Sequence, residues 1–473
     1  MTAGAALARG FALVTGGRVA GVLISLIQVK LAVSYLGPAG YGELTTVVLF
    51  TGLFEAFTDL GISTVIVRRS AGSDADLEKQ VGLSMALSLT YGLPLVAVCD
   101  ICGIALYHGQ PEIVFGIVLL SIGLAASTWS TCYAPVAQVR TRFGAYSAAE
   151  VTSRLLALGV TAATVSMGLG IRWLMFGLLI HPLARFVALE LWGRGQGRFR
   201  PVWDPAAMLL LTKEVLPFAY ILGVGMAYSR LDGLLLSKLS TLEEVGAYGL
   251  AYRIAGQLTI IAPIAGSVLI ARFAEDWAAG VAKFAATVRA SMRLLLVASV
   301  PVAVLCWPYS DDAIRLVGSG EFVKDASRPL ILLFIAVAIG MMTGLISAAL
   351  VVANQQRVLA KLNTATLLVN LGLNLALIPP MGAEGAGIAL VVSEGIGFCV
   401  SVWWLGRISA PVFDWTSSLL TAVSAGVAVA VGFALQGWYW LATAPLVLVV
   451  YAAAQLGTGN VSLRTLRGLR TDS

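Results

Sequence analysis

Long apolar stretches separated by short polar connectors run along the whole chain. Glycine, proline and charged residues bound these stretches, and the pattern predicts fourteen helices. An α-helix needs about 20 apolar residues to cross the hydrocarbon core of a bilayer. The predicted helices cover residues 11–35, 43–66, 80–107, 112–137, 147–168, 172–192, 213–238, 246–271, 284–309, 328–352, 358–378, 385–406, 415–435 and 438–456.

The composition agrees with a chain that lies almost entirely within a membrane. Hydrophobic residues make up 58% and charged residues 12% of the sequence, and the mean hydropathy is +0.88. A soluble globular domain contains about 25% charged residues. We therefore predict an all-α, multi-pass membrane protein, whose short connectors leave no room for a separate soluble domain.

The basic residues predict the orientation of these helices. If the N-terminus lies in the cytoplasm, the cytoplasmic connectors and tails hold eighteen Lys and Arg residues and the outer connectors hold five. Connectors rich in Lys and Arg remain in the cytoplasm, so both termini are expected there. The net charge of +6 is scattered over many connectors and forms no basic face, which argues against nucleic acid as a partner.

The chain contains an internal repeat. Moving the sequence forward by 204 residues places Gly42 on Gly246 and the triplet IVR at 66–68 on IAR at 270–272. Transporters that rock two halves about a central site are commonly built from such repeats. The predicted parts are an N-terminal six-helix lobe (1–192), a cytoplasmic linker with a surface helix (193–212), a C-terminal six-helix lobe (213–406), two further helices (407–456) and a basic cytoplasmic tail (457–473).

The linker carries a strong helix-start signal. Asp204 is a suitable N-cap, and Pro205 suits the first helical position because its missing N–H would have no partner there. A surface helix beginning at this point and a plain basic linker are both compatible with the sequence.

Eight basic residues fall within or close to the predicted helices. A charged side chain costs on the order of 3 kcal/mol at the bilayer centre, so one kept there normally faces water or a partner. Arg185, Arg289 and Arg293 are close enough to helix ends to extend to the membrane surface. The remaining five are Arg18, Lys30, Arg154, Arg230 and Arg253.

Two of these cations lie on polar helix faces. Arg18 shares a face with Gln28, and Arg253 shares one with Gln257, as the helical period requires. These faces would line a watery cavity. The alternative is local pairing, because Glu150 and Arg154 are four residues apart and can neutralise each other.

Acidic residues at membrane depth are fewer. Glu55 and Asp59 follow one another by four residues, so on a continuous helix they would be neighbours able to carry a coupling proton or sodium ion. Asp232 and Glu394 are further candidates for ion coupling. All four carboxylates could instead form ion pairs with Lys or Arg side chains on adjacent helices. A stripe of Asn363, Thr366, Asn370 and Asn374 could serve only in hydrogen bonding between helices.

Four segments carry a resemblance to a known family. They are LGPAGYGELT at 36–45, DLGISTVIVRR at 59–69, SRLDGLLLSKLSTLEEVGAYGLAYRI at 229–254 and NLGLNLALIPPMGAEGAGIAL at 370–390. In these segments the chain resembles the polysaccharide and O-antigen unit flippases of the multidrug/oligosaccharidyl-lipid/polysaccharide exporter superfamily. The resemblance covers essentially residues 11–406.

This resemblance implies two lobes in a V around a central cavity. It also implies movement of an undecaprenyl-diphosphate-linked glycan unit across the bacterial cytoplasmic membrane, from the cytoplasmic to the periplasmic leaflet. Arginine can grip phosphate with two hydrogen bonds, and lysine acts as a point charge. The candidates for binding the diphosphate head group are Arg18, Lys30, Arg154, Arg230, Arg253, Gln28 and Gln257.

The expected partners and cofactors follow from the same resemblance. The partners are the lipid-linked glycan, membrane lipids and, from the same pathway, a polysaccharide polymerase and glycosyltransferases. No cofactor is expected beyond a proton or sodium gradient, and two histidines are too few for a credible zinc site.

Three other functions compete with this interpretation. A multidrug or cation antiporter of the same superfamily typically carries an acidic residue in helix 1, where this chain has Arg18 and Lys30 and no carboxylate. A lipid II flippase of peptidoglycan synthesis has the same topology. A membrane glycosyltransferase or ligase is disfavoured, because the outer connectors are short and the loop at 310–327 has no credible metal-ligand arrangement.

Overall fold

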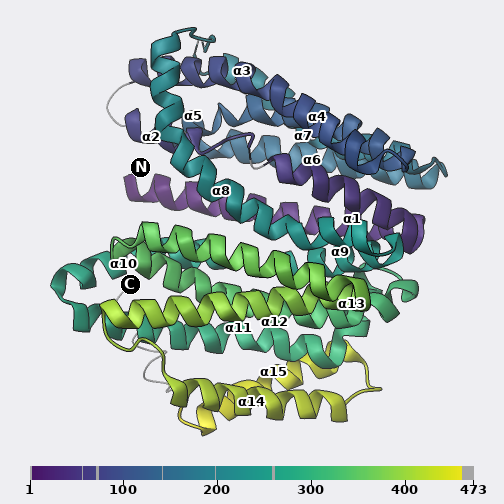
Figure 1. Ribbon diagram of the computed structural model, residues 1–473, viewed down its shortest axis with the longest axis vertical. Helices are drawn as coiled ribbons and strands as arrows, with labels where there is room; N and C mark the ends of the chain where they lie inside the picture. Colours follow the sequence, from purple (N-terminus) through teal and green to yellow (C-terminus); the bar gives the residue numbers. More distant parts are fainter. Residues whose placement is uncertain are drawn as a thin grey trace. The chain divides into compact units, whose positions relative to one another are not determined.

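The computed structural model describes residues 3–55, 57–70, 74–140, 142–197, 199–257 and 261–460. Within these ranges the side chains of 3–15, 18, 74–75, 221, 261–268 and 302 lie outside the description. The described ranges consist of helices and short connections without a β-strand, which confirms the all-α prediction (Figure 1).

The chain divides into two compact units, residues 1–246 and 247–473. The helices of the first unit are α1 (Ala3–Glu55), α2 (Ile62–Arg69), α3 (Asp74–Tyr107), α4 (Pro111–Thr131), α5 (Ala134–Val139), α6 (Phe143–Ser166), α7 (Ile171–Arg194), α8 (Pro205–Leu239) and the start of α9 (Leu242–Gly256). Those of the second are the rest of α9, α10 (Ile261–Ala279), α11 (Val281–Val317), the short η2 (Gly320–Phe322), α12 (Val323–Val352), α13 (Gln356–Ile408), α14 (Trp415–Ala434) and α15 (Trp440–Gly457).

The observed helices account for the fourteen predicted spans. Eleven helices among the described residues are long and apolar enough to cross a membrane. Two of them, α1 and α13, are 53 residues long and each holds two predicted spans, because the backbone leaves the helical conformation at Gly37 (φ 65°) and Gly382 (φ 54°). The predicted helix at 246–271 lies over α9 and α10.

The second predicted helix is not continuous. α1 ends at Glu55 and α2 begins at Ile62, and the chain between them passes through left-handed conformations at Leu60 (φ 52°) and Gly61 (φ 80°). Glycine adopts this conformation freely. A Cβ at Gly61 would lie 2.7 Å from the Cβ of Phe218, so the close approach of α8 also requires glycine here.

The glycines that marked the repeat pack at one place in the first unit. A Cβ on Gly42 would lie 1.9 Å from the carbonyl oxygen of Leu242, and one on Gly246 would lie 2.3 Å from the carbonyl oxygen of Pro38. α1 just after its bend at Gly37 and the start of α9 therefore approach backbone to backbone.

Residues 199–204 of the linker are not helical and contact α3. The N–H of Val202 donates to the carbonyl of Gly82 at 2.9 Å. Asp204 caps α8 as predicted, accepting from the N–H groups of Ala206 and Ala207 at 3.1 Å each, and Pro205 is the first residue of the helix. Residues 205–213 are the first turns of α8 and not a separate surface helix.

α8 packs within the first unit, against α1, α2 and α3. Gly233 permits this contact with α1, because a Cβ there would lie 2.4 Å from the Leu49 side chain. The predicted lobe boundaries at 192 and 213 stay predictions.

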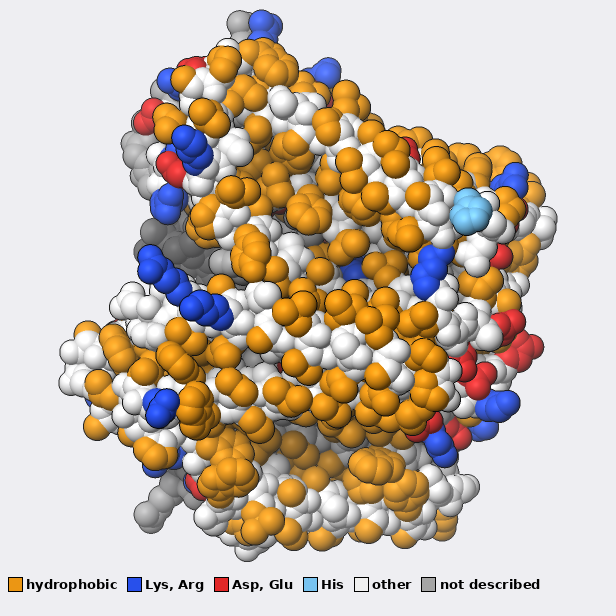
Figure 2. All heavy atoms as spheres, viewed as in Figure 1, with side chains coloured by type: hydrophobic (Ala, Val, Ile, Leu, Met, Phe, Trp, Pro, Cys, Tyr) orange, Lys and Arg blue, Asp and Glu red, His pale blue; other side chains and the backbone are white. Residues whose placement is uncertain are grey.

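Each unit has its own apolar core. In the first unit it includes Ile66, Leu77, Met85 and Leu189, and in the second Phe273, Phe284, Ile346 and Leu405. Figure 2 shows apolar side chains over much of the face in view, and many large apolar residues of the described part are more than one-third exposed. Such a surface suits a lipid environment, and the chain is a multi-pass membrane protein.

Candidate functional site

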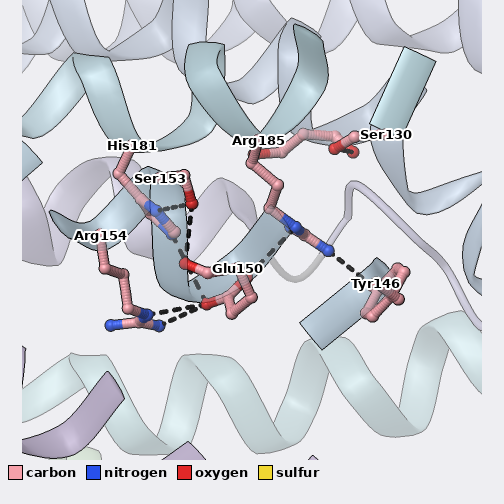
Figure 3. Close-up of polar contacts among 8 residues, drawn as sticks. Ser130, Tyr146, Glu150, Ser153, Arg154, His181 and Arg185 are labelled. Atoms are coloured by element: carbon pink, nitrogen blue, oxygen red, sulfur yellow. Dashed lines mark hydrogen bonds and ion pairs between the residues drawn. The ribbon is translucent and has the colours of Figure 1, made fainter. Parts of the chain in front are cut away.

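A cluster of charged side chains lies between α6 and α7. The Glu150 carboxylate is 2.8 Å from Arg154, 3.3 Å from Arg185 and 3.8 Å from the Nε2 atom of His181. Figure 3 shows the three side chains converging on Glu150 from two helices. One carboxylate thus holds two guanidinium groups within ion-pair distance.

The helical period explains how the cluster forms. Glu150 and Arg154 are one turn apart on α6, and His181 and Arg185 are one turn apart on α7, so each pair lies on one helix face. A tight turn at 167–170, with Gly168 at φ 66°, brings the two helices together. The Ser153 hydroxyl lies 2.9 Å from Nδ1 of His181, and Arg185 donates to the Tyr146 hydroxyl at 2.7 Å.

α1 closes one side of the cluster. A Cβ on Gly21 would lie 3.3 Å from the Arg154 side chain, and one on Gly17 would lie 3.4 Å from Ser147. These glycines let α1 approach α6 closely enough to cover part of the Arg154 stem. The Arg154 side chain is still 36% exposed, whereas that of Arg185 is 17% exposed.

Within ion-pair distance the cluster carries excess positive charge. Two guanidinium groups face one carboxylate, and among the described residues no second carboxylate lies within 4 Å of either arginine. Glu55 attracts Arg185 only from a longer distance. A positive excess at membrane depth is unfavourable by itself, and an anion that reaches Arg154 would relieve it.

The sequence identified only part of this cluster. The pairing of Glu150 with Arg154 is confirmed. The interpretation that Arg185 extends to the membrane surface is wrong, because its guanidinium group turns to Glu150 and Tyr146. The spacing of four residues between His181 and Arg185 could have indicated a polar face on this helix. It matches the spacing of Glu150 and Arg154 on the preceding helix.

The other predicted head-group residues are dispersed over both units. Arg18 lies on α1, and its side chain is outside the described residues. Lys30 is exposed on the same helix. The Arg230 guanidinium group lies against α1 at Gly52, where a Cβ would be 3.2 Å away, and its Nε is buried without a hydrogen-bond partner among the described residues.

Arg253 belongs to the second unit and is partly buried. Each of the two predicted glutamines donates a hydrogen bond. Gln28 donates to the Thr161 hydroxyl of α6 at 2.9 Å, and Gln257 donates to the carbonyl of Arg253 at 2.8 Å. Whether these residues bind a head group stays a prediction.

Glu55 and Asp59 do not lie on one continuous helix, which corrects the prediction. α1 ends at Glu55, and the N–H groups of Phe57 and Thr58 donate to carbonyls three residues earlier, so the helical spacing of four does not apply. Asp59 instead accepts from the Ser63 N–H at 3.2 Å and the Ser63 hydroxyl at 2.5 Å, in the first turn of α2, while Glu55 is exposed at the end of α1. Their role in ion coupling stays a prediction.

The two other ion-coupling candidates lie inside helix packing. Asp232 of α8 is 2% exposed, and Glu394 lies beside Gly340 of α12, where the missing side chain leaves room for it. Among the described residues, no group of three or more His, Cys, Asp or Glu side chains could hold a metal ion.

Amide side chains connect the two halves of α13. Asn370 donates to the Ser393 hydroxyl at 3.1 Å, and Asn374 donates to the Asn370 side-chain oxygen at 3.0 Å. Asn370, Asn374 and Ser393 are fully buried. The predicted polar stripe therefore does include a hydrogen bond between helices.

Comparison with solved structures identifies the fold. The chain is similar to the lipid II flippase MurJ in an inward closed conformation, with a TM-score of 0.76 at 14% identity over 94% of this chain and 97% of that one. It is similar to an inward-facing MATE-family multidrug resistance transporter of the MOP superfamily, with a TM-score of 0.65 at 16% identity over 82% and 94%. A MOP superfamily transporter from Pyrococcus furiosus gives a TM-score of 0.52 at 13% identity over 85% and 95%.

These likenesses establish the fold that MOP superfamily transporters and flippases share. A comparison with curated protein sequences finds no match. The family model described as "Polysaccharide biosynthesis protein" matches residues 35–324, which is more than half of the 473 residues. The chain therefore belongs to the polysaccharide biosynthesis protein family and has the MOP superfamily fold.

Proposed function

We propose that the protein is a flippase that moves an undecaprenyl-diphosphate-linked glycan unit across the bacterial cytoplasmic membrane for surface polysaccharide synthesis. The observation that carries the proposal is the excess of guanidinium groups over carboxylates around Glu150. Family membership supports the pathway, and the shared fold supports transport by alternating access. The pathway's polymerase and glycosyltransferases are the proposed protein partners.

The chemistry of the cluster suits a diphosphate. Arg154 is one-third exposed and keeps guanidinium N–H groups beyond those that contact Glu150. A diphosphate would compete with the Glu150 carboxylate for Arg154, and Arg185 would keep the carboxylate in place on the other side. The lipid tail would remain in the bilayer while the sugars cross in water, which avoids the cost of moving hydroxyl groups through hydrocarbon.

A transport assay with purified protein in liposomes tests this proposal. Arg154→Gln should lower the flipping rate of a prenyl-diphosphate oligosaccharide at least about tenfold, because it removes a charge-assisted hydrogen bond to phosphate. Arg172→Gln is the matched control, since Arg172 pairs with Glu112 and its side chain is 55% exposed. Wild-type flipping by a folded Arg154→Gln variant would refute the role of the cluster.

The choice of substrate separates the competing functions. The proposal expects flipping of prenyl-diphosphate oligosaccharides that lack the peptide of lipid II. Transport of lipid II alone would favour the peptidoglycan function suggested by the MurJ-like fold, and transport of organic cations alone would favour the antiporter function.

A proton or sodium gradient is the proposed source of energy. The motivating feature is the interrupted helix at Glu55 and Asp59, since broken helices in transporters expose carbonyl groups that can hold ions. Glu55→Gln with Asp59→Asn should change the dependence of flipping on pH or sodium concentration. An unchanged dependence would leave Asp59 only as the acceptor for Ser63 in the first turn of α2 and Glu55 as a surface charge.

A further inference from the structure

The second unit contains an apolar cavity separate from the charged cluster. Its volume is about 320 Å³, and α11, α12, α13 and the start of α14 surround it. One face of α11, from Met292 to Ala303, forms a wall, and Ile339 of α12 and Phe398 of α13 form others. Nearly all lining side chains are apolar.

The two polar side chains in the wall have little hydrogen-bonding capacity left for a water molecule. The Ser418 hydroxyl donates to the carbonyl of Asp414 at 2.9 Å, and the Thr421 hydroxyl donates to the carbonyl of Ser417 at 2.8 Å. A buried water needs two to four polar partners, about three in most sites. The cavity therefore suits hydrocarbon.

Two arginines mark one end of this cavity. Arg289 lies less than one turn before Met292, and it donates to the carbonyl of Pro411, two residues before the lining residue Phe413. Arg293 donates to the carbonyl of Asn460, whose side chain in turn donates to the lining residue Thr421.

Both arginines keep capacity for an anion. A guanidinium group has five N–H donors, and these backbone contacts use only part of them. Among the described residues, no carboxylate lies within 4 Å of either group. The sequence predicts that both side chains simply extend to the membrane surface. In that case their positive charges would have no counter-charge.

The length of the cavity wall defines the ligand further. Met292 and Ala303 are eleven residues apart on α11, which is about 17 Å along a helix axis. This length is close to half of the hydrocarbon core of a bilayer, which is about 30 Å thick. A chain from a single leaflet matches it, whereas a prenyl tail that reaches the second leaflet would extend beyond it.

We propose that the cavity binds one acyl chain of an anionic phospholipid whose phosphate lies against Arg289 and Arg293. The site is independent of the substrate and of the charged cluster in the first unit. The bound lipid would connect α11 to the α13–α14 connection and to the segment after α15, because the arginines already contact Pro411 and Asn460. Anionic lipids would therefore stabilise the attachment of α14 and α15.

Lipid titration of the purified full-length protein in neutral detergent tests the proposal. Phosphatidylglycerol should bind at one saturable site, counted by intact mass of the complex, and should raise the unfolding temperature more than phosphatidylcholine does. Arg289→Gln should weaken phosphatidylglycerol binding about fivefold, the effect of one basic residue near an anionic lipid surface. Arg315→Gln, at the opposite end of α11, is the matched control.

A cavity-filling variant tests the acyl-chain part separately. Ala338→Phe places a ring in the cavity and should abolish saturable binding, whereas Ala430→Phe, on the exposed side of α14, should not. Equal binding of the two phospholipids, or unchanged binding in a folded Ala338→Phe variant, would overturn the proposal. Displacement of phosphatidylglycerol by a prenyl diphosphate would also overturn it, because the cavity would then belong to the substrate.

Discussion

In each unit a carboxylate holds two cations where two consecutive long helices meet, and the two arrangements differ in the balance of charge. Glu150 faces Arg154 and Arg185 between two helices of the first unit. Asp276 of the second unit faces Arg272 at 3.1 Å and Lys283 at 3.0 Å, at the turn between α10 and α11.

The difference lies in how the charges are balanced. The Arg272 and Lys283 side chains are each 57% exposed, and Glu275 adds a second carboxylate 3.7 Å from Arg272. Acids and bases are therefore equal in number at this turn. Around Glu150 the arginines are less exposed and outnumber the acid within 4 Å. A carboxylate between two cations thus joins two helices near the membrane surface in the second unit. In the first unit the same kind of contact leaves positive charge at membrane depth.

The corresponding helix pair of the second unit uses no charge for its central contact. The fifth and sixth predicted spans meet at Glu150, whereas the eleventh and twelfth, the two halves of α13, meet through Asn370 and Ser393. The helix order repeats, but the polar chemistry between equivalent helices does not. This asymmetry is why we assign the diphosphate to the first unit.

Removing the shared carboxylate at depth should have the largest effect. Glu150→Ala leaves Arg154 and Arg185 without their anion and should lower the free energy of unfolding by about 3 kcal/mol, the lower end of values for breaking a buried ion pair. Thermal or denaturant unfolding in detergent measures it. A loss below about 1 kcal/mol would mean that the pair contributes no more than an ordinary surface salt bridge.

The neutral contact of the second unit should be worth less. Asn370→Ala removes the hydrogen bond to Ser393 and should cost about 1–2 kcal/mol of unfolding free energy, the range for a hydrogen bond between membrane helices. Asn363→Ala is the control, because Asn363 is exposed on the same half of α13. Equal losses in the two variants would contradict a structural role for the buried amide.

The smallest effect should come from Asp276, and it should depend on pH. The hydroxyl of Thr287, with Lys283 and Arg272, holds the pKa of the Asp276 carboxyl below its usual range. A carboxyl whose pKa is lower in the folded state stabilises above its unfolded pKa of about 3.9, and the stabilisation is lost as the pH falls through the folded value. Asp276→Asn should lower the unfolding temperature at pH 7 and match wild type in strong acid. A constant difference at all pH values would contradict this assignment.

The sequence by itself determined the class of protein and the position of its helices. Runs of apolar residues long enough to cross a bilayer can satisfy their backbone only as helices in hydrocarbon, so their length and spacing define the spans. Local signals also sufficed where both partners lie within one turn, as with the Asp204 cap and the pair of Glu150 and Arg154.

Only the tertiary structure decided which distant side chains meet. The sequence placed Arg185 near the membrane surface because it contains no information on which face of α7 packs against α6, and packing turned the side chain to Glu150. Helical spacing joined Glu55 to Asp59, but α1 ends at Glu55 and Asp59 lies in the turn that follows it. Periodicity defines a helix face, whereas the charge that a face meets depends on the neighbouring helix.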